Sequence, residues 1–389
     1  MQPAFTFCTP TRIEFGFGSS ERVGSEAKSQ SASRALVVTD PGIRSSGILD
    51  AIVAHLEAAG VAAIVFDDVA ANPRDTSVVA GEQRAREESC EVIVGVGGGS
   101  AMDCAKAISV VLALGGTVQD YVEELDAPSK IPGPATPLIA IPTTAGTGSE
   151  ATFWAVITDS SSGRKKALGD PLCAPRVALV DPELTVSLPP LLTATTGVDA
   201  LTHAIEAYAA PCGTPVSESV AASAIRLVSQ NLRQAYADGA NKEARANMML
   251  ASLLAGIALG NSSTGGVHAM AETIGGVYDA PHGAAIAAYL SVVMDFNLLA
   301  VPDKFAQIAE LMGEGIRGLS VIAAARKAPA AVRSLVADLD LPNAKALGVG
   351  DDDLPELARG AAANLSTLGN ARPVGEADYL ALYRLAQSQ

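Results

Sequence analysis

The first half of the chain repeats one pattern, in which a short apolar run is followed by a turn and then by a segment with helical periodicity. The apolar runs lie at residues 35–39, 62–66, 92–96 and 138–141, and helical segments at 48–59 and 76–88 alternate with them. Strands that are apolar throughout are typical of a parallel sheet covered on both faces. The pattern therefore predicts an α/β fold with a parallel, Rossmann-like sheet.

Further elements follow from the same reading. Residues 5–17 alternate as in a strand, residues 151–158 and 166–168 predict a hairpin, and residues 176–180 predict a short buried strand. After Leu188 the pattern changes to long helical periodicities at 199–208, 216–234 and 242–259. A chain of 389 residues also exceeds the size at which one core stops growing. We therefore expect an α/β domain at 1–188 and an all-α domain at 189–389.

Two glycine-rich loops follow predicted strands. Gly97, Gly98, Gly99 and Ser100 separate a strand from a helix, and Thr143 and Thr144 begin the loop PTTAGTGSE. Glycines allow close approach of a phosphate, and a helix N-terminus offers free N–H groups. Glycine turns also join strands to helices in α/β sheets without any ligand, and GGGS is not the G-x-G-x-x-G motif.

Three of the four histidines fall in two short blocks. His203 follows Asp199 by four residues, which places both on one helix face, while His268 and His282 stand fourteen positions apart in GGVHAMAETIGGVYDAPHG. Imidazole nitrogens and a carboxylate are ligands that suit iron(II) or zinc. The alternative is that each histidine is an ordinary polar residue at a helix end.

Composition excludes several classes of partner. The net charge of −15 argues against nucleic acid or an anionic membrane as a partner, because both require basic patches. Five cysteines without paired spacing favour a reducing compartment. The N-terminus lacks the pattern of a signal peptide, and the longest apolar run is too short to span a bilayer. We expect a cytoplasmic protein.

Four blocks together resemble the iron-containing (group III) alcohol dehydrogenase family. They are GGGSAMDCAKA, PTTAGTGSE, the Asp199 and His203 pair, and HAMAETIGGVYDAPHG, in the family's order and spacing. The resemblance covers nearly the whole chain. It implies a dehydroquinate synthase-like architecture, with an N-terminal dinucleotide-binding domain and a C-terminal helical domain that binds a divalent metal. A homo-oligomer, a dimer or larger, is also expected.

The resemblance implies a role for each matching residue. The metal, Fe²⁺ or alternatively Zn²⁺, is expected to be held by Asp199, His203, His268 and His282. A carboxylate at Asp40, the position that contacts the adenosine ribose, favours NAD over NADP. The residues expected to bind NAD are Asp40, Asn72, Gly97, Gly98, Gly99, Ser100, Thr143, Thr144 and Lys165.

The expected reaction interconverts an alcohol and its aldehyde or ketone, with the metal polarising the substrate oxygen while NAD accepts hydride. One departure from the family lies close to the ligands, because Glu272 stands where a second histidine is usual, four residues after His268. Glu272 is therefore predicted either to relay a proton from the substrate hydroxyl or to act as an outer hydrogen-bonding group.

Other functions stay open at this point. A maleylacetate reductase-type or glycerol dehydrogenase-type enzyme of the same superfamily would use the same residues. A dehydroquinate synthase-like lyase needs a basic pocket beside the ligands, which the C-terminal half does not offer. A non-catalytic NAD-binding protein would have little reason to keep four metal ligands.

Overall fold

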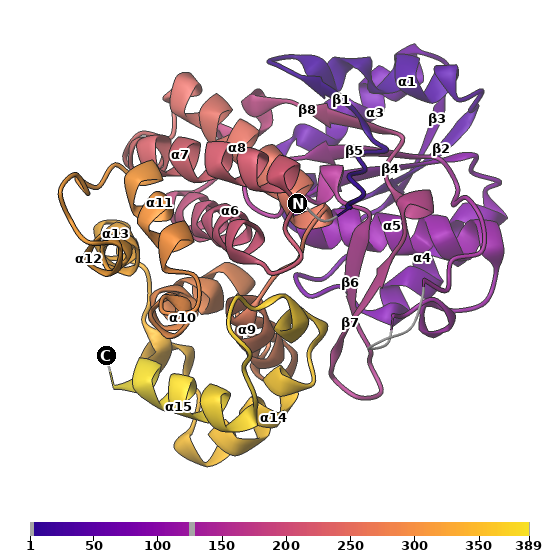
Figure 1. Ribbon diagram of the computed structural model, residues 1–389. Coiled ribbons are helices and arrows are strands. Elements are labelled where there is room, and N and C mark those ends of the chain that lie inside the picture. The colour runs from indigo at the N-terminus through magenta and orange to yellow at the C-terminus, as the bar shows by residue number, and fades with distance from the viewer. Residues whose placement is uncertain (1–3, 124–128, 389) are drawn as a thin grey trace. The chain divides into compact units, whose positions relative to one another are not determined.

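The computed structural model describes residues 4–123 and 129–388, and these form two compact units (Figure 1). The sheet unit contains residues 8–144 and 148–187. The helical unit runs from Leu188 to the C-terminus and also includes residues 145–147 and the N-terminal segment that ends at Phe7. These two short segments precede residue 188 in the chain, and the domain bounds 1–188 and 189–389 stay a prediction from the sequence.

The sheet unit is built on six parallel strands in the order β1-β8-β5-β4-β2-β3. The middle strands are buried along nearly their whole length, as their continuous apolar sequences predict. The bounds are β1 (Arg12–Phe15), β2 (Arg34–Val38), β3 (Ala62–Phe66), β4 (Val92–Gly97), β5 (Leu138–Pro142) and β8 (Val177–Val180). The prediction of a strand over residues 5–17 was too long, because only Arg12–Phe15 pairs with β8.

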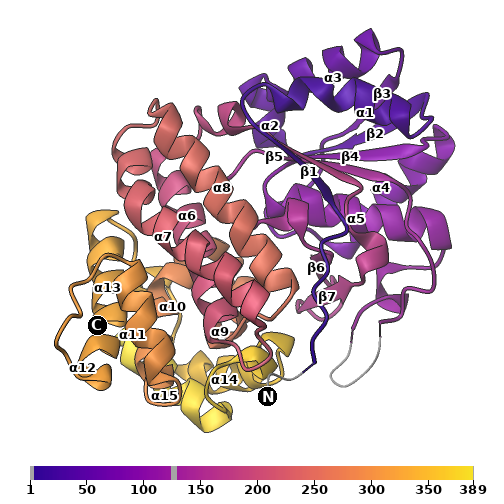
Figure 2. The same ribbon diagram turned by 45° about the horizontal axis from the view of Figure 1, so that its top comes forward.

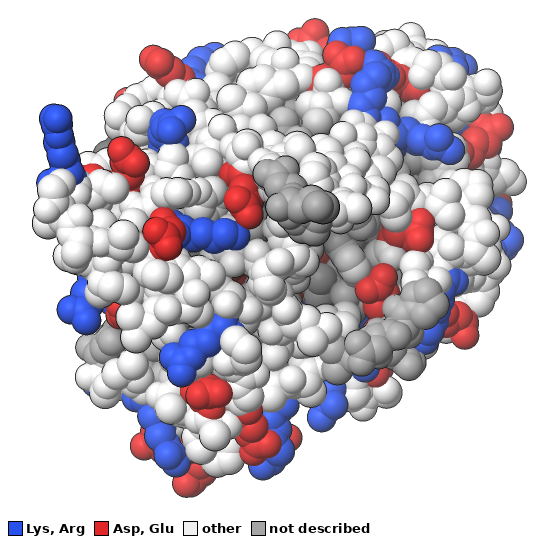
Figure 3. Space-filling model, viewed as in Figure 1, with Lys and Arg blue, Asp and Glu red and all other residues white. Residues whose placement is uncertain are grey.

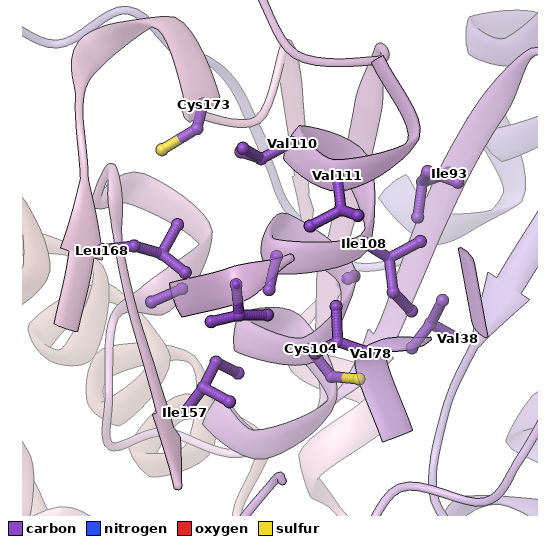
Figure 4. Packing of buried hydrophobic residues seen from close by; sticks show 14 of the residues in the cluster. Val38, Val78, Ile93, Cys104, Ile108, Val110, Val111, Ile157, Leu168 and Cys173 are labelled. Atoms are coloured by element: carbon purple, nitrogen blue, oxygen red, sulfur yellow. The ribbon is translucent and has the colours of Figure 1, made fainter. Parts of the chain in front are cut away.

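Side chains of the middle strands alternate between two layers of helices. Val37 packs with α1 (Val23–Ser29) and α3 (Ile48–Ala58). Leu36 and Val38 pack on the other face with α4 (Asp75–Glu87) and α5 (Gly99–Leu114). Figure 4 shows this second cluster, in which Val38, Val78 and Ile108 meet. The short helix α2 (Pro41–Ser46) follows β2.

The predicted hairpin is present as the antiparallel strands β6 (Trp154–Thr158) and β7 (Lys165–Gly169). It packs against α5. Ile157 and Leu168 of the hairpin join the same core cluster as α5. Short 3-10 helices complete the chain: η1 (Ser19–Arg22), η2 (Val118–Asp120), η3 (Ser149–Ala151), η4 (Pro171–Cys173), η5 (Pro182–Thr185), η6 (Ala344–Leu347), η7 (Asp351–Asp353) and η8 (Leu365–Gly369).

The helical unit is arranged around α6 (Pro190–Ala209), which contacts α7 (Pro215–Ala237), α8 (Lys242–Gly260) and α10 (His282–Asn297) (Figure 2). Proline at the first position and the capping side chains of Thr214 and Asn241 define where α6, α7 and α8 begin. The remaining helices are α9 (Gly266–Tyr278), α11 (Pro302–Leu311), α12 (Val321–Ala325), α13 (Lys327–Asp338), α14 (Leu354–Ala362) and α15 (Glu376–Gln387). Between Thr193 and Ala209 every residue of α6 except Thr196 is buried, so its polar side chains lie in the interior.

The surface shown in Figure 3 carries acidic and basic side chains interspersed, with no continuous basic patch on that face. Within the described ranges, no helix combines the length and the apolar character that crossing a lipid bilayer requires.

Candidate metal and cofactor sites

The glycine loop lies where the carboxyl ends of β2, β4 and β5 meet. Gly97 ends β4 with φ of +146°, a conformation that favours glycine, and its carbonyl accepts a hydrogen bond from the Thr143 N–H at 3.0 Å. A Cβ on Gly98 would stand 3.5 Å from the Thr144 hydroxyl oxygen. In the sheet, β3 lies on one side of the β2–β4 pair and β5 lies on the other side, so the order of the strands reverses between β2 and β4. Open α/β sheets bind ligands at the carboxyl end of such a reversal.

Asp40 follows β2 at the same edge. Its Oδ1 accepts hydrogen bonds from the N–H groups of Gly42 at 2.8 Å and Ile43 at 3.1 Å, and so caps α2. Its Oδ2 points toward the glycine loop, since a Cβ on Gly97 would lie 3.2 Å from it. The cofactor role of Asp40 stays a prediction from the sequence, whereas its role as the cap of α2 was not predicted.

The other predicted cofactor residues are less closely grouped. The Ser100 hydroxyl donates to the Ala71 carbonyl, which brings the half-buried Asn72 next to the glycine loop. Lys165 begins β7 opposite Thr158, on the hairpin rather than at the loop.

A buried hydrogen-bond network connects α5 to the second glycine-rich loop, PTTAGTGSE. Lys106 is completely buried, and its ammonium donates to the Ser149 hydroxyl at 2.7 Å, to the Thr152 hydroxyl at 3.0 Å and to the Trp154 carbonyl at 2.6 Å. The Ser149 hydroxyl in turn donates to Asp103 at 2.7 Å. Burial lowers the pKa of Lys106 and raises that of Asp103, and the attraction between the two charges opposes both shifts.

Glu150 lies beside this network and was not singled out from the sequence. Both its carboxylate oxygens are buried and lack a hydrogen-bond partner among the described residues. Burial raises its pKa to about 7. No spacing in PTTAGTGSE distinguishes this buried glutamate from an exposed one.

The candidate metal centre lies in the helical unit, where three helices bring ligand atoms together. Asp199 comes from α6, His268 from α9, and His282 is the first residue of α10. One ligand atom from each lies within 4.8 Å of the others. Asp199 Oδ1 stands 3.6 Å from both His268 Nε2 and His282 Nε2, which is too far for hydrogen bonds.

The fourth predicted ligand is adjacent to this cluster. His203 Nε2 lies 3.9 Å from Asp199 Oδ1, and the His203 ring stacks on that of His268 with centroids 4.4 Å apart. The structure thus brings the three predicted histidine ligands around Asp199, and Asp199, His268 and His282 form the tightest set. Gly283 permits this approach, because a Cβ there would stand 2.6 Å from the Thr195 carbonyl oxygen of α6.

The electrostatics of the cluster favour a cation. Burial alone would raise the pKa of Asp199, but His203, His268 and His282 outweigh it and hold that pKa below its usual range. For His268 burial acts to lower the pKa, yet Glu206 and Asp199 raise it to about 10. Among the described residues, the buried Asp199 Oδ1 and His268 Nε2 have no hydrogen-bond partner. Two unpaired donor atoms in a negative environment fit a divalent metal.

Two glutamates lie close in sequence to the predicted ligands, Glu272 four residues after His268 and Glu206 three residues after His203. The carboxylate of Glu272 accepts a hydrogen bond from the Asn364 amide at 2.7 Å, so one of its oxygens is already engaged. Glu206 hydrogen-bonds His268 Nδ1 at 2.5 Å and was missed by the sequence reading. Its position three residues after His203, on the same face of α6, was the signal that could have identified it.

A parallel sheet with a glycine loop at its carboxyl edge, together with a buried histidine and aspartate cluster in a helical unit, defines the class of metal-dependent dinucleotide oxidoreductases. Residues 10–182 match the model of the family described as "Iron-containing alcohol dehydrogenase". Residues 193–387 match "Fe-containing alcohol dehydrogenase family, C-terminal". The chain belongs to the iron-containing alcohol dehydrogenase family.

Individual relatives agree over nearly full length. The chain is 42% identical to a 1,3-propanediol dehydrogenase of Klebsiella pneumoniae over 98% of both chains. It is 40% identical to an NAD-dependent methanol dehydrogenase of Bacillus methanolicus over 94% of this chain and 95% of the relative. A crystal structure of 1,3-propanediol oxidoreductase has a TM-score of 0.95 at 42% identity, covering 99% of this chain and 100% of the other.

These comparisons confirm the predicted family, the predicted fold class and the predicted class of enzyme, an NAD-dependent alcohol oxidoreductase. Membership of the family implies NAD and a divalent metal as cofactors and a small molecule as substrate.

Proposed function

We propose that the protein interconverts a small alcohol and its aldehyde or ketone, using NAD and one divalent metal ion. The observation that most directly supports this is the convergence of ligand atoms of Asp199, His268 and His282 from three helices to within 4.8 Å of one another. The residues proposed to hold the metal are Asp199, His203, His268 and His282. When bound, a divalent ion would supply a Lewis acid that polarises the substrate oxygen.

The metal proposed is Fe²⁺, with Zn²⁺ as the alternative, because three imidazoles and a carboxylate suit both ions. Glu272 is proposed as a proton relay to the substrate hydroxyl. Its hydrogen bond from Asn364 fixes its orientation and leaves the second carboxylate oxygen to accept the proton.

The cofactor proposed is NAD rather than NADP. Asp40 Oδ2 faces the glycine loop, where a carboxylate would accept hydrogen bonds from a ribose and repel a 2′-phosphate. Gly97–Ser100, Thr143 and Thr144 are proposed to hold the dinucleotide, with Asn72 and Lys165 at its margins. We accordingly assign dinucleotide binding to the domain of residues 1–188 and metal binding to that of residues 189–389.

The substrate proposed is a short alcohol, since the relatives described above are named for methanol and 1,3-propanediol. A homo-oligomeric state and a cytoplasmic location stay predictions from the sequence.

The test combines metal analysis with NADH absorbance on a panel of alcohols and aldehydes. We expect about one divalent ion per chain, loss of activity on chelation, and recovery with Fe²⁺ more than with Zn²⁺.

His268→Ala should lower both metal affinity and turnover by about 100-fold or more, because it removes a ligand. His55→Ala, on α3 of the sheet unit, is the control and should change neither. Full metal content and normal turnover in His268→Ala would contradict the proposal, and an absence of net NAD reduction with every alcohol would favour a lyase or a non-catalytic protein.

A further inference from the structure

Glu206 of α6 is a buried carboxylate at the beginning of α9. Its Oε2 accepts a hydrogen bond from the Gly265 N–H at 2.8 Å and lies 2.5 Å from His268 Nδ1. Its Oε1 accepts from the Val267 N–H at 2.8 Å. Converging N–H donors at the N-terminus of a helix stabilise a negative charge. Both carboxylate oxygens of Glu206 therefore act as hydrogen-bond acceptors.

An acceptor-only partner determines the protonation of the neighbouring imidazole. Because Glu206 accepts, His268 Nδ1 must carry the hydrogen, and in a neutral ring the lone pair then lies on Nε2. Nε2 is the atom that faces Asp199 Oδ1 at 3.6 Å, inside the ligand cluster. We infer that Glu206 is a positioning residue that fixes the tautomer and ring orientation of His268 for metal binding. This inference rests on the proposed metal site.

The same residue connects the helices that carry the ligands. Asp199, His203 and Glu206 are spaced by four and three residues, so they share one face of the buried helix α6. Through Gly265 and Val267, Glu206 also holds the first turn of α9, the helix that carries His268. A substitution of Glu206 can therefore weaken metal binding in two ways, by changing the tautomer of His268 or by shifting the helix α9 that carries it.

Asn370 offers a control that separates these two effects. Its Oδ1 accepts from the Gly266 N–H at 3.1 Å and so anchors the same helix terminus. The other hydrogen bonds of its side chain are with Asn297 and Arg372. A variant at Asn370 disturbs the helix start and leaves the Glu206 to His268 contact in place.

The first measurement is zinc affinity by competition with a chromophoric chelator. Glu206→Gln should weaken zinc binding by about 10–100-fold, because an amide must present an N–H to one of three donors. Glu206→Asp keeps an acceptor-only group and should recover part of that loss. Asn370→Ala should stay within about threefold of the wild type. An equal loss in Asn370→Ala, or none in Glu206→Gln, would overturn the inference.

The second measurement reads the tautomer directly. With only four histidines, a protein labelled with ¹⁵N in the imidazole rings gives a simple spectrum, and His268→Asn and His55→Asn assign its signals. The zinc-loaded wild type should show His268 bound through Nε2 with a downfield Nδ1–H, and Glu206→Gln should move that proton upfield. A wild type that binds zinc with His268 lacking the Nδ1–H would overturn the inference even if the variants fail to fold. A wild type that binds no zinc would instead contradict the proposed metal site.

Discussion

Asp40 is one carboxylate that caps a helix and also faces the proposed cofactor site. One of its oxygens caps α2, and the other faces Gly97 of the glycine loop. Replacing Asp40 by glycine would remove the cap and the charge together, so a change in cofactor preference could not be attributed to charge. Asparagine keeps the capping oxygen and removes only the charge.

We expect Asp40→Asn to raise the ratio of kcat/KM for NADP to that for NAD by about tenfold, since it removes a charge that repels the 2′-phosphate. Steady-state kinetics with both cofactors measure this ratio. Asp50→Asn, an exposed aspartate on α3, is the control and should leave the ratio unchanged. An unchanged ratio in Asp40→Asn would mean that Asp40 acts only as the cap of α2.

The residues of the candidate metal cluster could be selected from the sequence because the chain has only four histidines and three of them stand in the family's sequence blocks. The spacing of Glu206 from His203 indicates a shared helix face, but it does not show which groups Glu206 binds, because those groups lie 59 to 62 positions away in the chain. The burial of Glu150 could not be predicted from the sequence either, because it depends on how η3 packs on α5 and β5.

Among the elements, strands with continuous apolar sequences were predicted to within one or two residues of their observed bounds. β3 occurs at Ala62–Phe66 and β4 at Val92–Gly97, because their side chains are covered by helices on both faces. The N-terminal strand was predicted too long for the opposite reason. Phe5 and Phe17 remain half exposed, so their alternation carries no information about pairing, and the strand is defined by β8, far away in the chain.

The α5 network predicts a large effect on stability. Lys106→Met leaves the partly buried carboxylate of Asp103 without its cation, which should destabilise the sheet unit by about 2–4 kcal/mol. Urea unfolding followed by the fluorescence of Trp154, the only tryptophan and itself part of the network, reports this region directly.

Lys28→Met, at an exposed position in the same unit, should change stability by less than about 0.5 kcal/mol. Changing Asp103 to Asn as well should restore part of the loss in Lys106→Met, because the partly buried unpaired charge is removed. An equal midpoint for Lys106→Met and the wild type would show that the buried ammonium does not stabilise the loop.

In the whole molecule, the proposed cofactor site and the proposed metal site lie in different units. The sheet unit holds the glycine loop and Asp40, and the helical unit holds the ligand cluster. The order of these blocks along the chain was sufficient to predict the family, and the comparisons over nearly full length confirm it. The division itself was less predictable, because residues 145–147 join the helical unit from within the second loop.

The central claim is that this cluster binds the catalytic metal. Crystals of the wild type grown with Fe²⁺ and measured at the iron absorption edge test it most directly through an anomalous difference map. We predict a single strong peak about 2.0–2.2 Å from Asp199 and from the Nε2 atoms of His203, His268 and His282. A peak at another position, or none at this cluster in a protein that turns over alcohol, would contradict the account.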